Sequence, residues 1–255
     1  MCIRDSHLTD KPFNRYYLHS VDGFVYMSEQ VHSELRAYSD APALFSPHPL
    51  FENFGERVER SEACVRLGLD PANRYVLFFG LIRDYKGLDL LLDAWAQLRR
   101  AGRTEGRRLI VAGEFYASRE RYVRQIEELH LGEEVILHDF FVPDADVKYY
   151  FSAADVLVQP YKTATQSGVT QIAYQFCVPM VVTKVGGLAE IVPDGRVGYV
   201  CEPTPEGVAG AIERMYEGDT LQRFRENCVE ERRRFSWEEM CSRITELYGL
   251  VASGK

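Results

Sequence analysis

The sequence predicts an α/β protein built on a doubly wound parallel sheet with helices on both faces. Six short apolar runs alternate with amphipathic stretches of helical period, which is typical of parallel sheets. Glycine-bearing polar turns follow three of these runs, and the carboxyl edge of an open α/β sheet is where ligands bind. The expected strands are 75–79, 108–112, 134–138, 156–159, 180–183 and 198–201.

The first polar turn, Gly80–Gly87, carries two cations. It joins the apolar run 75–79 to a helix expected over 88–98, and it contains Arg83 and Lys86. Free amide groups, the helix dipole and two positive side chains can converge there on one phosphate. A solvated basic turn is the alternative, and further turns of the same kind argue against it.

The second polar turn, 163–171, follows the run 156–159 and opens a helix expected from near Gly168 to Phe176. Small hydroxyl residues and a glycine at a helix start supply capping oxygens and let a ligand approach the backbone closely. We interpret Ser167 and Thr170 as helix caps, because neither has a His or Asp partner at the spacing of nucleophilic chemistry. A third turn, 185–188, follows the next strand.

The C-terminal region is predicted to be helical. Amphipathic stretches cover 206–216, 221–234 and 237–251. Ser236 is the expected N-cap of the last stretch, and Glu239 three positions later would complete a capping box.

In order and spacing, the motifs resemble the retaining, nucleotide-sugar-dependent glycosyltransferases of the GT-B fold. The C-terminal domain of that family has a glycine, a basic turn and Lys-Gly after its first strand, as in Gly80–Gly87. It also has an Ala-Asp-Val strand start that ends in proline, as in Ala154–Pro160. A Val-Gly-Gly-Leu-x-Glu turn with a following Asp-Gly is matched by Val185–Glu190 and Asp194–Gly195. The resemblance covers most of the chain and implies a Rossmann-like donor-binding domain.

The resemblance also implies site residues. Arg83 and Lys86 are the expected catalytic residues, which neutralise the departing nucleoside diphosphate so that no metal or other cofactor is needed. The expected substrate-binding residues are Gly80, Phe141, Thr165, Gln166, Ser167, Gly168, Val169, Gln171, Gly187 and Glu190. Besides Ser167, three of these have a structural alternative: core packing for Phe141, packing against the sheet for Gln171, and the first turn of a short helix for Glu190.

One feature departs from the family pattern. Relatives show two glutamates eight positions apart around the glycine-rich helix start, whereas Thr165 or Gln166 stands near the first place here and Ile172 or Ala173 near the second. The residues that hold the sugar and ribose hydroxyls are therefore left open.

The resemblance implies three parts. Residues 1–54 are expected to be the remnant of an N-terminal acceptor domain and its linker, 55–235 the donor domain, and 236–255 a helix packing back towards the N-terminal domain. The remnant has a strand-like run, 22–27, a helix, 29–38, capped by Ser28, and a proline-containing linker, 40–54. Most of the acceptor domain is expected to be missing, and residues 1–6 resemble a translated sequencing adapter.

Composition narrows the function class. A net charge of −8 argues against a general nucleic-acid binder, and no apolar stretch approaches the roughly 20 residues that span a bilayer. Six scattered cysteines lack the close pairs of metal or redox motifs, which favours reduced thiols in the cytoplasm.

We therefore predict transfer of a sugar from a nucleotide-sugar donor, with the fragment alone binding donor and being inactive. The acceptor class is left open among a glycan, a lipid-linked sugar and a small molecule. Cell-envelope polysaccharide synthesis, at the inner face of the membrane through the N-terminal domain, is the expected setting. The alternatives are a nucleotide-sugar epimerase or a phosphorylase on the same fold, or a non-catalytic nucleotide-binding module.

Overall fold

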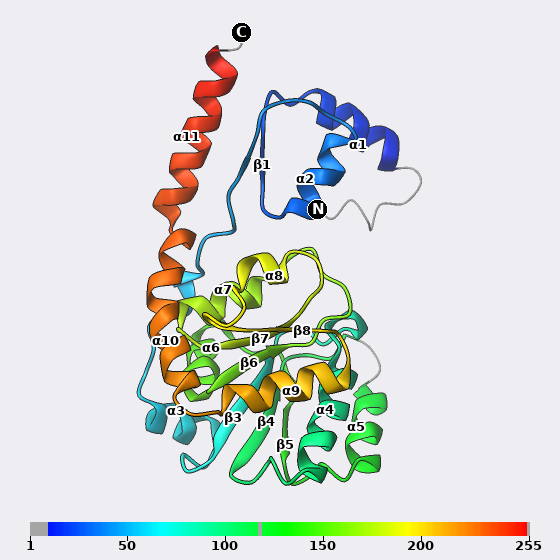
Figure 1. Ribbon diagram of the computed structural model, residues 1–255, viewed down its shortest axis with the longest axis vertical. Helices are drawn as coiled ribbons and strands as arrows, with labels where there is room; N and C mark the ends of the chain where they lie inside the picture. The colour runs from blue at the N-terminus through cyan, green and yellow to red at the C-terminus, as the bar shows by residue number, and fades with distance from the viewer. Residues whose placement is uncertain (1–9, 117–118, 254–255) are drawn as a thin grey trace. The chain divides into compact units, whose positions relative to one another are not determined.

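The computed structural model describes residues 10–116 and 119–253 (Figure 1). The chain divides into two compact units. One comprises Met1–Pro49 with Arg234–Lys255, and the other comprises Leu50–Arg233. These boundaries lie within five residues of the expected domain limits.

The larger unit contains a six-stranded parallel sheet in the order β5-β4-β3-β6-β7-β8. Its strands are β3 (Arg74–Phe79), β4 (Arg107–Ala112), β5 (Val135–His138), β6 (Val156–Gln159), β7 (Met180–Thr183) and β8 (Gly198–Cys201). The predicted α/β class and all six predicted strands are confirmed to within one residue. The order places β3 between β4 and β6, so the turns after β3 and β6 are neighbours at the carboxyl edge.

Helices flank this sheet (Figure 1). They are α3 (Arg60–Leu67), α4 (Leu88–Arg100), α5 (Arg119–Glu128), α6 (Asp144–Ala153), α7 (Gly168–Gln175), α8 (Leu188–Ile191), α9 (Pro205–Met215) and α10 (Thr220–Glu231). Short 3-10 helices are η2 (Glu52–Phe54), η3 (Asp84–Lys86) and η4 (Arg232–Phe235). The helices expected over 88–98, 168–176 and 206–216 are confirmed as α4, α7 and α9, with small differences at their ends.

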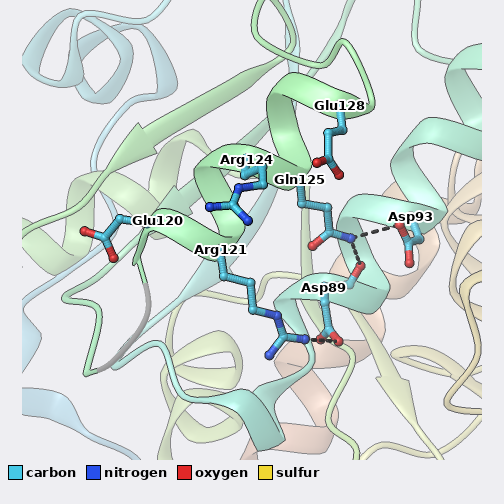
Figure 2. Close-up of a pocket in the computed structure, with 7 residues that line it drawn as sticks. All are labelled: Asp89, Asp93, Glu120, Arg121, Arg124, Gln125 and Glu128. Carbon is cyan, nitrogen blue, oxygen red and sulfur yellow. Dashed lines mark hydrogen bonds and ion pairs between the residues drawn. The ribbon is translucent and has the colours of Figure 1, made fainter.

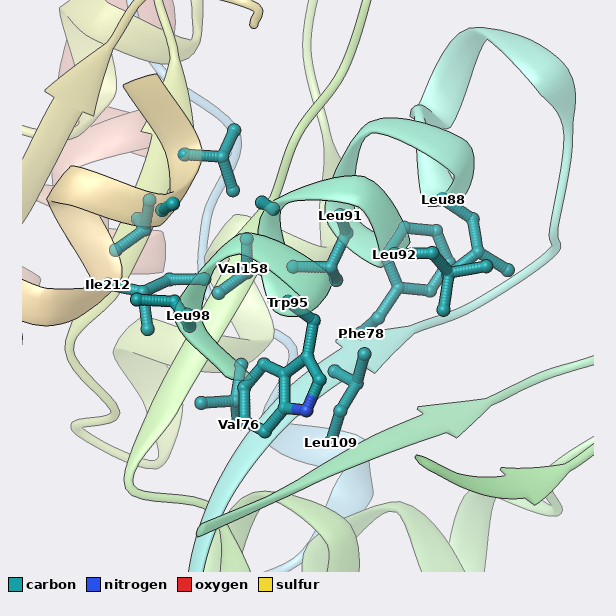
Figure 3. Packing of buried hydrophobic residues seen from close by; sticks show 14 of the residues in the cluster. Val76, Phe78, Leu88, Leu91, Leu92, Trp95, Leu98, Leu109, Val158 and Ile212 are labelled. Carbon is teal, nitrogen blue, oxygen red and sulfur yellow. The ribbon is translucent and has the colours of Figure 1, made fainter. Parts of the chain in front are cut away.

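Successive side chains of β3 point to opposite faces of the sheet, because a β-strand is pleated. Val76 and Phe78 pack with Leu91, Leu92 and Trp95 of α4 in one buried cluster (Figure 3). Phe79 faces the other side, where the centroid of its ring lies 5.1 Å from the centroid of the Phe151 ring in α6. Burial on both faces explains why this strand is an unbroken apolar run rather than an alternating one.

The smaller unit contains a parallel pair of short strands, β1 (Phe24–Tyr26) and β2 (Ala43–Phe45). It also contains α1 (Asp10–His19), α2 (Glu29–Arg36) and α11 (Trp237–Ser253), and α11 contacts both strands. The interpretation of 40–54 as linker was wrong for its middle, because β2 lies there. Three residues are too few to show an alternating pattern, and only pairing with β1 makes them a strand.

The two predicted caps in this unit form. The side chain of Ser28 accepts a hydrogen bond from the amide of Val31, and Ser236 Oγ accepts one from the amide of Glu239 over 3.1 Å. The Glu239 carboxylate pairs with Arg243 over 3.0 Å. None of the helices in the described part of the chain combines the length and apolar character needed to cross a membrane.

Candidate functional site

The turn after β3 brings Lys86 to the carboxyl edge of the sheet. η3 ends at Lys86, and Gly87 follows in the left-handed region at φ +70°. A Cβ at Gly87 would collide with the carbonyl oxygen of Pro160, so only glycine lets this turn pack on the end of β6. The strand order and this glycine together hold Lys86, on the first polar turn, beside the second polar turn after β6.

Lys86 is buried, with 8% of its surface exposed. Its Nζ lies 3.1 Å from the point where a Cβ on Gly80 would stand and 5.7 Å from the centroid of the Tyr161 ring. Burial, and then repulsion from the Arg83 guanidinium, lower the pKa of Lys86 to about 8. No carboxylate pairs with it among the described residues. A buried cation with no partner is costly, and such costs are typical of sites that receive an anion.

Arg83 is placed differently from Lys86. Its side chain is exposed and its guanidinium lies 4.2 Å from the centroid of the Tyr116 ring. Arg83 lines neither of the two cavities described next. Its charge nevertheless reaches the site, because it contributes to the lowered pKa of Lys86.

The first cavity, of about 300 Å³, lies between the turn after β3 and the start of α7. Five of the predicted site residues line it together, from Lys86 on one turn and from Gln166, Ser167, Gly168 and Val169 on the other. Its remaining lining residues are Phe51, Phe54, Tyr85, Tyr161 and Ile172.

The second cavity, of about 160 Å³, is largely apolar. It contains two further predicted residues, Gly80 and Phe141, and it shares Phe54 with the first cavity. Its other lining residues are Phe79, Leu81, Gly113, Glu114, Val142, Asp144 and Val147. Phe141 is 67% exposed, which contradicts the alternative that it is core packing. An apolar recess with an exposed aromatic ring suits the flat face of a nucleobase.

The interpretation of Ser167 and Thr170 as helix caps is confirmed for the position of Ser167, which is the N-cap residue of α7, and was wrong for Thr170, which lies within the helix. Ser167 makes no side-chain cap hydrogen bond, and its Oγ instead accepts one from Gln159 Nε2 over 2.7 Å. Thr170 Oγ1 donates to Gln159 Oε1 over 2.9 Å. Hydroxyl side chains near a helix start can bond either to backbone amides or to other side chains. Here both hydroxyls bond to the buried side-chain amide of Gln159, at the end of β6.

The other predicted residues lie outside the two cavities. The amide of Gly187, at the start of α8, donates to the Thr165 carbonyl over 3.2 Å, so the second and third turns touch. Glu190 is exposed on α8. Gln171 is 1% exposed, and its side-chain amide has no hydrogen-bond partner among the described residues. That burial agrees with packing against the sheet better than with a ligand contact.

A third, polar pocket of about 570 Å³ lies between α4 and α5 (Figure 2). Arg121 pairs there with Asp89 over 3.0 Å, and Gln125 donates to Asp93 over 2.9 Å. Arg121 and Lys162 both pair with Asp84 in η3, and their hydrogen bonds lower the pKa of that carboxyl. This pocket shares no residue with the two cavities. The ion pairs of Arg121 and Lys162 with Asp84 stabilise the turn that carries Lys86.

Sequence reasoning missed several residues of the site. Gln159 is a polar residue at the end of an otherwise apolar strand, and that break in the pattern was the available signal. Phe51 and Phe54 come from the segment taken as linker, and Glu114 follows β4 as the other turns follow their strands. Nothing local marks the two phenylalanines, because only the fold brings them over the carboxyl edge.

Comparison with known proteins finds relatives of this chain in sequence and in fold. The family model described as glycosyl transferases group 1 matches residues 73–218. A D-inositol 3-phosphate glycosyltransferase 1 of Catenulispora acidiphila is 30% identical over 206 residues, which are 77% of this chain and 49% of that protein. A D-inositol 3-phosphate glycosyltransferase of Corynebacterium diphtheriae is 27% identical over 236 residues, 88% of this chain and 55% of that protein.

Two solved structures show the same fold. Sucrose-phosphate synthase from Thermosynechococcus elongatus superposes with a TM-score of 0.82 at 22% identity, over 99% of this chain and 64% of that one. Anabaena Alr3699/HepE, solved in complex with UDP and glucose, superposes with a TM-score of 0.72 at 19% identity, over 94% of this chain and 68% of that one. The predicted GT-B type of Rossmann-like domain is confirmed.

The chain spans about half the length of the curated relatives it matches. The matched family region begins at the start of β3 and ends beyond α9, so it contains both turns of the first cavity. This chain therefore belongs to the family of glycosyl transferases group 1.

Proposed function

We propose that this chain binds the nucleotide-sugar donor of a glycosyltransferase, and that the whole protein transfers the sugar to an acceptor with retention at the anomeric carbon. Lys86 carries the proposal. It is a buried cation without a carboxylate partner in the part of the chain that the structure describes, and it is set at the wall of a cavity beside the start of α7. A diphosphate placed there would supply the missing counter-charge and meet the positive end of the helix dipole.

In this proposal Lys86, Arg83 and the amides at the start of α7 stabilise the leaving group, which is the nucleoside diphosphate. When the bond between the anomeric carbon and the diphosphate oxygen breaks, the electron pair stays on the diphosphate. The Lys86 ammonium group and the amides that open α7 bind that growing negative charge, with Arg83 adding its field from outside the cavity. Charge stabilisation of this kind needs no metal ion.

The second cavity is the proposed base site. Its apolar walls and the exposed ring of Phe141 would cover the flat base, while Gly80, without a side chain, leaves room between the base and Lys86. Gln166 lines the first cavity, and we assign it to the donor sugar in place of a glutamate of the resembled family's pattern.

The names of the relatives suggest which ligands to try first. HepE was solved with UDP and with UDP-glucose, and several relatives act on inositol 3-phosphate by name. UDP and UDP-sugars are therefore the first donors to test, and inositol phosphates the first acceptors. Cell-envelope synthesis at the inner face of the membrane is the setting we propose for the whole protein.

Calorimetric titration of the 255-residue chain with UDP, GDP and ADP tests the proposal. At least one should bind, and Lys86→Met should weaken its binding by about 1.5–3 kcal/mol, the range for charge-assisted hydrogen bonds. Arg83→Ala should weaken it by less than about 1 kcal/mol, because the exposed Arg83 acts on the cavity only through its screened charge. Arg100→Met is the matched control, since Arg100 ends α4 at the far end from the Lys86 turn. Equal affinity in wild type and Lys86→Met would overturn the diphosphate assignment.

A non-catalytic nucleotide-binding module is the second candidate. The neutral stretch from Thr165 to Ala173 favours it, because the pattern of the resembled family has two glutamates there. Donor consumption by the whole protein separates the two candidates. Binding without any sugar transfer or donor hydrolysis would favour the module.

A further inference from the structure

A buried hydrogen-bonded network adjoins the first cavity. Gln159, the last residue of β6, is 1% exposed, and its Nε2 donates to Ser167 Oγ over 2.7 Å and to the Tyr161 hydroxyl over 3.3 Å. Its Oε1 accepts from Thr170 Oγ1 over 2.9 Å. The hydroxyl oxygens of Ser167 and Tyr161 are themselves 3.1 Å apart, within hydrogen-bond distance.

Counting protons fixes the orientation of the Gln159 amide. The triangle of Gln159, Ser167 and Tyr161 contains three contacts, and each needs one proton. With Nε2 facing the hydroxyls, its two protons serve two contacts and one hydroxyl proton serves the third. With Oε1 facing them, only two hydroxyl protons would remain for three contacts. The first orientation is therefore the stable one, and it leaves exactly one hydroxyl proton unused.

The unused proton belongs to Ser167. Both side chains line the first cavity, but Tyr161 is 2% exposed whereas Ser167 is half-buried, and among the described residues Ser167 Oγ is the acceptor that the Tyr161 hydroxyl reaches. A buried hydroxyl that failed to donate would lose a hydrogen bond, so Tyr161 donates to Ser167. Ser167 then accepts twice, from Gln159 and from Tyr161. Its own proton points away from both, and its side chain lines the first cavity.

We propose that Gln159 and Tyr161 are positioning residues that hold the Ser167 hydroxyl as a hydrogen-bond donor facing the first cavity, where it binds a phosphoryl oxygen of the nucleotide donor together with Lys86. This inference rests on the proposed function and deepens it. Lys86 Nζ lies against the Tyr161 ring, at 5.7 Å from its centroid, so both donors border the same side chain. In this arrangement the Lys86 ammonium group and the Ser167 hydroxyl can both only donate hydrogen bonds. An anionic oxygen, which only accepts, fits such a pair better than a sugar hydroxyl, which must also donate its own proton to an acceptor.

A double-mutant cycle on the full 255-residue chain tests the proposal, with UDP and inorganic pyrophosphate as probes. Ser167→Ala and Gln159→Met should each raise the dissociation constant about tenfold, as expected for loss of one hydrogen bond to a charged group. Because Gln159 acts through Ser167, the double variant should also lose about tenfold, not a hundredfold. A hundredfold loss would show that Gln159 does not act through Ser167 and would overturn the proposal.

Two further variants separate positioning from general loosening. Thr183 Oγ1 donates to the Tyr161 carbonyl over 2.6 Å, so Thr183→Val removes a buried hydrogen bond nearby without touching the three side chains. Its affinity should stay within about twofold of wild type. Tyr161→Phe should lose less than Ser167→Ala, because Gln159 still donates to Ser167. If Tyr161→Phe lost more, Tyr161 and not Ser167 would be the donor, and the proposal would be wrong.

Gln159→Glu adds a test by pH. The shape is kept, but an ionised carboxylate only accepts, so it draws the Ser167 proton towards itself and away from the cavity. Affinity relative to wild type should therefore be low at pH 8 and recover as the carboxyl is protonated at lower pH. A ratio that does not change with pH would contradict the proposal.

The outcomes also separate this inference from the proposed function. If Lys86→Met weakens UDP binding and Ser167→Ala does not, only the role of Ser167 fails. If neither UDP nor pyrophosphate binds the wild-type chain, both fail.

Discussion

The ammonium group of Lys86 lies so close to Gly80 that a side chain there would be in tight contact with it. The Nζ atom lies 3.1 Å from the ideal Cβ position of Gly80, and Val169 is 3.4 Å from the same point. The glycine that follows β3 and the lysine six residues later are thus in direct contact. The absence of a side chain at Gly80 is what allows the cation to sit at the wall of the cavity.

Gly80→Ala should weaken UDP binding about tenfold or more without removing any charge. The new Cβ would be in tight contact with Lys86 Nζ and would shift it within the cavity wall, and the φ of +96° adds backbone strain of about 1–2 kcal/mol. Gly106→Ala is the control, because Gly106 is also in the left-handed region, at φ +65°, but faces open space. Calorimetry and urea unfolding of both variants measure the two effects. Equal affinities of Gly80→Ala and Gly106→Ala for UDP would show that the contact between Gly80 and Lys86 does not matter for binding.

Affinity for UDP should fall as pH rises through about 8, where Lys86 loses its charge. Stability should change in the opposite sense. The folded-state pKa of about 8 lies below the ordinary 10.5, so between these values the unfolded chain binds more protons and the unfolding free energy rises with pH.

Lys86→Met isolates this contribution to the pH dependence. In the absence of ligand at pH 7, Lys86→Met should have a higher unfolding free energy than wild type, by up to about 3 kcal/mol. The reason is that a buried charge is replaced by an apolar side chain of similar length. Urea unfolding from pH 7 to pH 10 gives the comparison. Parallel curves for wild type and variant over that range would rule out the titration of Lys86.

Gly87→Ala should prevent the turn after β3 from packing on the end of β6. Its Cβ would meet the Pro160 carbonyl oxygen, in addition to the strain of φ +70°. We expect a loss of more than about 3 kcal/mol in unfolding free energy, as for other severe steric changes. Gly102→Ala has nearly the same φ, +69°, and open space around it, so it should lose only about 1 kcal/mol. Similar losses in the two variants would show that backbone strain alone matters.

Asp155 should be required for stability. Its carboxylate accepts a hydrogen bond from the Tyr75 amide over 2.8 Å and pairs with Arg74 over 3.1 Å and Arg60 over 3.4 Å, with only 3% of its side chain exposed. Asp155→Ala should cost about 3–5 kcal/mol, because it leaves a buried amide and cations without their partner.

Asp146→Ala is the matched control for that change. Asp146 pairs with Arg66 over 3.1 Å at a more exposed position, so its loss should cost less than about 1 kcal/mol. Chemical denaturation followed by circular dichroism measures both. A small effect of Asp155→Ala would show that the Ala-Asp-Val motif does not anchor β6 to β3.

Much of the fold could be predicted because its signals are local. Strands buried on both faces are continuous apolar runs, and glycines mark the places where the chain must turn sharply or approach another backbone closely, as at Gly87. β2 escaped prediction because a three-residue strand has no period of its own and exists only through pairing with β1. The caps at Ser28 and Ser236 were predictable because the bonds they make span three residues.

The site was predictable only in part. The sequence by itself determined the six strands, the cationic turn with Lys86 and the polar turn from Gln166 to Val169, since each is a short pattern within one segment. Only the tertiary structure decided that β3 lies beside β6, so that these turns face one cavity, and that the Ser167 hydroxyl bonds to Gln159 instead of capping α7. Strand order and hydrogen-bond choice depend on residues far apart along the chain. They are settled by which groups burial brings together, and no local pattern carries that information.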